Sequence, residues 1–76
     1  MKYVLDAAQM LTKEEAHEYL KEVFEFPEYY GRNLDALYDF LSEMEDVIVE
    51  VKNFSEEHVY MKQVLRVMKD AGVRFC

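Results

Sequence analysis

Four side chains between residues 35 and 42 have types and a spacing that could do chemistry. They follow the spacing i, i+3, i+4 and i+7, which places on one helical stripe Asp35, Tyr38, Asp39 and Ser42. The two aspartates are like charges four residues apart, which costs a helix roughly a few tenths of a kcal/mol. A local choice that opposes helix stability tends to mark function. The opposing explanation is that the stripe is the solvated face of an amphipathic helix.

Three kinds of chemistry could use this stripe. Asp35 and Asp39 could form a catalytic pair, but an exposed helix offers little burial to separate their pKa values, as acid–base catalysis needs. Together with Glu43 they could hold a hard cation, although three acids without backbone carbonyl ligands make a weak site. The third use is the binding of a basic partner. We therefore expect a non-enzyme with no metal and no cofactor.

The charge is concentrated around this stripe. The chain has 76 residues and a formal net charge of −7. Residues 25–46 contain seven acids and one base, Arg32, so this segment alone carries −6. Tyr29 and Tyr30 lie just before the helix, where one of them is expected to pack inward, and tyrosine is enriched among the residues that dominate binding at interfaces. On spacing alone the solvated-face reading is favoured, and the charge and the tyrosines bring the two readings close to even.

The other residues with reactive side chains give no second constellation. His17 and His58 lie on different predicted helices, without a Cys or His partner at metal-ligand spacing, and His17 is interpreted as a surface residue. Cys76 has no neighbouring base and is expected to be buried or frayed. Ser55 is explained as a helix N-cap.

The elements that must position the stripe can be read from local signals. Thr12 and Glu15 form a capping box that opens a helix, which Pro27 stops. Gly31 is expected to take a positive φ in a tight turn, and Asn33 is a good N-cap. The remaining elements are strands at residues 3–5, 47–51 and 73–76, and helices at about 34–44 and from Ser55 to Gly72.

This order of elements predicts the fold class. Strands separated by helices favour a parallel sheet with right-handed crossovers. We expect an α/β fold, a small three-stranded parallel sheet packed with about three helices, in one domain of residues 1–76. The nearly continuous apolar run at residues 47–51 is typical of a strand covered on both faces.

Composition excludes several classes of function. An acidic chain lacks the Lys and Arg needed to displace counterions from nucleic acid, and anionic membrane surfaces are disfavoured likewise. No apolar run approaches the roughly 20 residues that a membrane span needs, and no signal peptide is predicted. A fold of this size with one cysteine suits a reducing interior, so we expect a cytoplasmic protein.

A longer motif surrounds the stripe. Residues 27–39 read P-E-Y-Y-G-R-N-L-D-A-L-Y-D. This segment resembles the signature of the barstar family, the intracellular inhibitors of barnase-type ribonucleases, and a looser likeness extends over most of the chain. The resemblance implies a barstar-like fold, and it implies inhibition of a secreted guanyl-specific ribonuclease by blocking its active site.

The resemblance also implies roles for individual residues. Tyr29 and Tyr30 would be loop contacts. Gly31 would shape the loop and bring its backbone to the enzyme, and Asn33 would cap and orient the helix. Asp35 and Asp39 would meet cationic phosphate-binding residues of the ribonuclease, and Tyr38 would be an aromatic contact. Ser42 and Glu43 complete the candidate surface. The expected complex is one-to-one, with a free inhibitor that is monomeric.

Some positions depart from the family pattern. Tyr38 stands where barstar has tryptophan, and Val59 stands where an acid near the start of the last helix contacts the enzyme. Glu56 or Glu57 could replace that acid. These departures keep a second hypothesis open, in which the chain is an immunity or adaptor module for a different basic protein.

Overall fold

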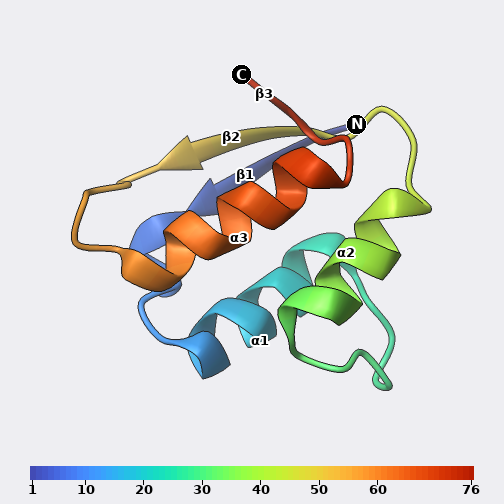
Figure 1. Cartoon of the computed structure of the whole chain (residues 1–76), viewed down its shortest axis with the longest axis horizontal. Helices are drawn as coiled ribbons and strands as arrows, with labels where there is room; N and C mark the ends of the chain where they lie inside the picture. The colour runs from blue at the N-terminus through green and yellow to red at the C-terminus, as the bar shows by residue number, and fades with distance from the viewer.

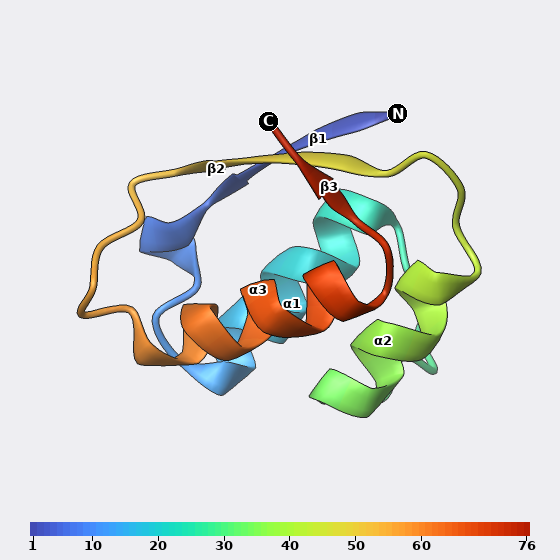
Figure 2. The ribbon, with the colours of Figure 1, turned by 45° about the horizontal axis from the view of Figure 1, so that its top comes forward.

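The chain folds into two layers, a sheet and a layer of helices, as shown in Figures 1 and 2. The structure is a computed structural model that describes residues 1–76. Its elements, in chain order, are β1 (Lys2–Asp6), the 3-10 turn η1 (Ala7–Gln9), α1 (Lys13–Phe24), α2 (Leu34–Ser42), β2 (Ile48–Lys52), α3 (Val59–Asp70) and β3 (Arg74–Phe75). The predicted α/β class with three helices and a three-stranded sheet is confirmed.

The sheet is parallel, with strand order β1-β2-β3. All three helices lie on one face of it (Figure 2). The expectation that the central strand is covered on both faces is therefore wrong. Val49 is fully buried, whereas the neighbouring Glu50 forms an ion pair with Lys2 at 3.0 Å and both side chains remain partly exposed. Because side chains alternate between the two faces of a strand, Val49 points to the helices and Glu50 points to the face that no helix covers.

Side chains define the helix ends. The Thr12 hydroxyl accepts a hydrogen bond from the Glu15 N–H at 3.1 Å, which confirms the predicted start of α1. The predicted start of α3 at Ser55 is wrong. Ser55 accepts from the Glu57 N–H at 3.3 Å in a separate turn, and the helix begins at Val59 without a side-chain cap. At the other end, Gly72 with φ +94° follows α3, as expected.

The core lies between the sheet and the helices. It is one cluster of 16 buried residues, to which α2 contributes Leu37 and Leu41, and α3 contributes Met61, Val64 and Met68. No helix has the length and the apolar composition needed to cross a membrane. Because the buried stripe of α2 is fixed against this core, the opposite stripe must face outward.

Candidate protein-binding surface

The outward stripe of α2 begins at a capped helix end. The Asn33 side chain accepts a hydrogen bond from the Ala36 N–H at 2.7 Å and donates one to the Gly31 carbonyl at 3.2 Å. The cap fixes the direction in which the helix leaves the loop. With Leu37 buried, the exposed residues of α2 and its C-cap are those predicted from the spacing, namely Asp35, Tyr38, Asp39, Ser42 and Glu43. We call these five residues the α2 acidic face.

The carboxylates of the α2 acidic face have no cationic partner in the chain. The structure contains five ion pairs, and none of them includes Asp35, Asp39 or Glu43. The one base within residues 25–46, Arg32, pairs with Glu18 of α1. The negative charge of this surface is therefore left for solvent or for a basic partner.

The loop of residues 26–33, which joins α1 to α2, places two adjacent tyrosines in different environments. The Tyr29 side chain is 81% exposed, whereas Tyr30 is only 2% exposed. The Tyr29 ring lies 6.0 Å from the ring of Phe40, a half-buried residue of α2 outside the α2 acidic face, so the exposed tyrosine packs against the same helix. The Tyr30 ring is the one that packs inward, and Tyr29 is the tyrosine whose ring is open to a partner.

Gly31 shapes the loop in a different way from the one expected. The positive φ occurs at Arg32, with φ +53°, and not at Gly31. A Cβ on Gly31 would lie 3.2 Å from the Ala36 Cβ and 3.3 Å from the Asn33 Nδ2. A side chain here would crowd the first turn of α2, and its neighbours would have to shift by a few tenths of an ångström.

The prediction that His17 is a surface residue is wrong. The side chain is fully buried, and its ring nitrogens lie 2.7 Å from the Tyr30 hydroxyl and 2.6 Å from the Tyr60 hydroxyl. Burial, with a smaller contribution from Lys13, lowers the pKa of His17 below its ordinary value. The sequence contained a signal, because Leu20 and Phe24 follow at i+3 and i+7 on the buried stripe of α1.

The acids before α3 lie away from this surface. The connection between β2 and α3, which carries Glu56 and Glu57, is at the opposite end of the molecule from the 26–33 loop (Figure 1). Glu56 pairs with Lys62 at 2.8 Å, while Val59 is 67% exposed at the first position of α3.

The exposed thiol of Cys76 lies at the end of the chain. No three side chains of His, Cys, Asp or Glu gather closely enough to hold a metal ion.

Comparison with known proteins adds a family to this geometry. Residues 1–75 match the family described as "Barstar (barnase inhibitor)". The chain is also similar to a Bacillus subtilis (strain 168) protein named "Putative ribonuclease inhibitor YrdF". The two are 37% identical over an alignment 76 residues long. The alignment covers 92% of this chain and 84% of that protein. These matches span nearly all of the chain, including the loop and the helix that form the candidate surface, and the chain therefore belongs to the barstar family.

Proposed function

We propose that this protein inhibits a barnase-like, guanyl-specific extracellular ribonuclease by placing the α2 acidic face and Tyr29 in the active site of the enzyme. Family membership supports a ribonuclease inhibitor role, and with it a non-catalytic protein. The observation that carries the proposal is the row of unpaired carboxylates on α2 beside two exposed tyrosines. Tyr38 is 42% exposed and Tyr29 is 81% exposed.

The proposed mechanism is electrostatic substitution. A ribonuclease active site is a cationic cleft that binds phosphate, and carboxylates on a rigid helix can occupy it as phosphate surrogates. Asp35 and Asp39 are one helical turn apart, so their separation is set by the helix and not by flexible loops. Because no ion pair within the chain has to be broken, the carboxylates are available to guanidinium groups, which can bind them in a bidentate way, and to ammonium groups of the enzyme.

The proposal extends to the complex as a whole. A compact acidic face and a cationic cleft favour a one-to-one complex with a basic enzyme, formed by a free inhibitor that is monomeric. Unpaired charges of this kind steer the encounter, so association is expected to be fast at low ionic strength and slower with added salt. In this scheme the inhibitor acts in the cytoplasm and protects the cell from the ribonuclease that the cell itself secretes.

The test is an inhibition titration against a barnase-type ribonuclease at low and at physiological salt. The variant is Asp35→Asn/Asp39→Asn, and the matched control is Glu22→Gln/Asp70→Asn. Both variants remove two exposed helical carboxylates that have no ion-pair partner, so their net charges are equal. We expect stoichiometric inhibition by the wild type and by the control, and a loss of at least about a hundredfold in affinity for the variant, as interface hot spots often cost 2 kcal/mol or more each.

Two results would contradict the proposal. Equal losses in both variants would mean that only net charge matters and that the α2 acidic face is not the contact. No inhibition by the folded wild type would exclude this class of ribonuclease. Capture of a different basic protein, lost in Asp39→Ala, would then favour the immunity or adaptor hypothesis.

A further inference from the structure

His17 is the one residue of the polar and charged types that is buried in this protein. His17 of α1 contacts the Tyr30 hydroxyl through Nδ1 at 2.7 Å and the Tyr60 hydroxyl through Nε2 at 2.6 Å. The imidazole is fully buried and no buried side-chain polar atom in the structure lacks a partner. One side chain therefore joins three segments, α1, the 26–33 loop and α3.

The surroundings decide which ring nitrogen carries the proton. The Tyr30 hydroxyl is buried and contacts no other acceptor, so its proton must be donated to Nδ1. The Nε2–H then donates to Tyr60, which is partly exposed and can give its own proton to water. This arrangement requires a neutral imidazole, since a second ring proton at Nδ1 would leave the Tyr30 hydroxyl proton without an acceptor.

Charged groups near the network do not compensate a charged imidazole. Lys13, on the same helix, opposes a positive charge on His17. Burial has the largest effect on the pKa of each tyrosine, while Arg32 on the loop lowers the pKa of Tyr30 and Glu14 raises the pKa of Tyr60, which lies on α3. Burial raises the pKa of Tyr30 and of Tyr60, so both hydroxyls keep their protons. The network therefore consists of three neutral groups with defined hydrogen-bond directions.

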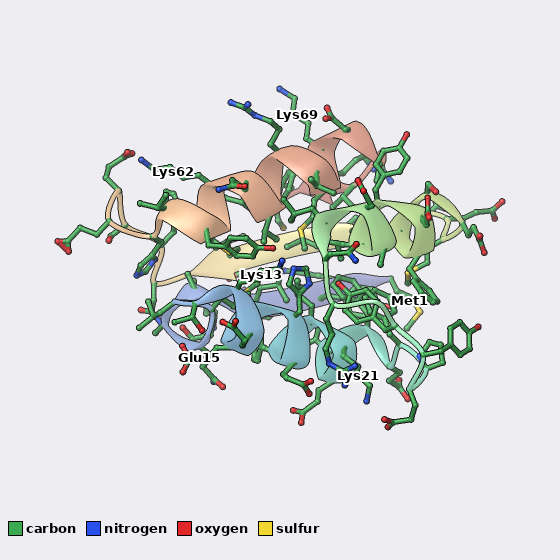
Figure 3. The ribbon with its side chains drawn as sticks, turned by 60° about the horizontal axis from the view of Figure 1, so that its bottom comes forward. Met1, Lys13, Glu15, Lys21, Lys62 and Lys69 are labelled. Carbon is green, nitrogen blue, oxygen red and sulfur yellow. The ribbon has the colours of Figure 1, made fainter.

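Tyr30 connects this network to the loop. Its ring lies 4.7 Å from Phe26 and 5.7 Å from Phe40 of α2, so apolar packing supports the ring, and the hydrogen bond to His17 adds a directional contact at its hydroxyl. Apart from a backbone hydrogen bond from the Phe26 N–H to the Lys21 carbonyl at 2.9 Å, the other polar contacts between the loop and α1 are ion pairs at the surface, from Glu18 to Arg32 and from Lys21, labelled in Figure 3, to Glu28 at 3.0 Å. Exposed ion pairs contribute little and are screened by salt.

We propose that His17 is a positioning residue, which fixes the 26–33 loop through Tyr30 so that Tyr29 and the Gly31 backbone are presented to the ribonuclease in one conformation. The inference rests on the proposed function for its effect on affinity, and on the geometry alone for its effect on the loop. His17 does not touch the partner, and it acts through the residue that lies between two predicted contacts. Preorganisation of a loop increases affinity because less conformational entropy is lost on binding.

The test compares two matched deletions of a hydroxyl. Tyr30→Phe and Tyr60→Phe each remove one hydrogen bond to the same imidazole and keep the aromatic ring. Only Tyr30→Phe disconnects the loop. We expect both variants to lose stability in urea, and Tyr30→Phe alone to bind the ribonuclease about tenfold more weakly, as one lost hydrogen bond predicts. Tyr60→Phe should change affinity by less than about twofold.

A second measurement does not depend on the ribonuclease. Hydrogen exchange should accelerate in Tyr30→Phe at the amide of residue 30, which donates to the Pro27 carbonyl at 3.0 Å, relative to the globally exchanging amides, and not in Tyr60→Phe. Ring nitrogen NMR shifts of wild-type His17 should show the neutral Nε2–H form. Equal affinity losses in the two variants, unchanged loop exchange in Tyr30→Phe, or an Nδ1–H ring would overturn the positioning role. If the wild type binds no ribonuclease, the proposed function fails, and the loop measurements still decide the positioning role.

Discussion

The helices α2 and α3 pack on the same core but differ on their outer faces. Both bury an apolar stripe, Leu37 and Leu41 in α2 and Met61, Val64 and Met68 in α3. The outer face of α3 carries mainly bases, and Figure 3 shows Lys62 and Lys69 projecting from α3 on the side away from α1. Lys62 is paired with Glu56 at 2.8 Å, whereas Arg66 and Lys69, like the carboxylates of the α2 acidic face, take part in none of the five ion pairs.

The two helices also differ in how their charges suit the helix dipole. α3 has Lys69 in its last turn, where a cation is stabilising, followed by one acid, Asp70. α2 has no base in its last turn, and it ends in Glu43 followed by Glu45 and Asp46, which oppose the dipole. The stability of α2 does not explain these acids. The difference teaches that a charged stripe is informative when it works against its own helix.

The largest expected effect should show that the buried faces are alike. Leu37 and Met68 are both fully buried, so Leu37→Ala in α2 and Met68→Ala in α3 should each lower the free energy of unfolding by about 2–5 kcal/mol. Urea denaturation monitored by circular dichroism measures both. A loss below about 1 kcal/mol for Leu37→Ala would mean that α2 is not anchored to the core as described.

The next effect concerns His17, which links the loop before α2 to Tyr60 of α3. Its pKa is lowered in the folded state, mainly by burial. Between the unfolded pKa of about 6.5 and the lower folded value, the unfolded chain binds more protons, so the free energy of unfolding should decrease as the pH falls through this window. Urea midpoints measured from pH 8 to pH 5 should show this decrease in the wild type.

His17→Gln is the control for this pH dependence. It should remove the slope below pH 6.5, because glutamine does not titrate. The lowered carboxyl pKa values of Asp6 and Glu50 start from 3.8 and 4.5, so these groups titrate below this window. A slope that persists unchanged in His17→Gln would assign the pH dependence to another group.

The smallest expected effect is on stability, and its sign should differ between the outer faces of α2 and α3. Glu43→Gln, at the C-cap of α2, should raise the free energy of unfolding by about 0.3–1 kcal/mol, because it removes an acid from the negative end of the helix dipole. Lys69→Gln, in the last turn of α3, should lower it by a similar amount. Thermal unfolding of the free protein at low salt measures both shifts. Changes of the same sign would show that the dipole does not distinguish these helices.

The sequence alone determined the features that depend on near neighbours. Thr12 and Asn33 form the caps that were predicted, and the spacing of α2 separated the buried leucines from Asp35 and Asp39. These results rest on contacts within about four residues, which follow from the periodicity of one helix. The unequal charge along the chain was likewise visible without a structure.

Only the tertiary structure decided what depends on distant segments. The choice of Tyr30 over Tyr29 for the core, the burial of His17 and the open face of the sheet were not predicted. His17 meets Tyr30 across 13 residues and Tyr60 across 43, and no local pattern encodes which segments will meet at that distance. A histidine on an apolar stripe becomes a buried acceptor only when packing supplies its hydroxyl partners, because unpaired burial of that ring would be unfavourable.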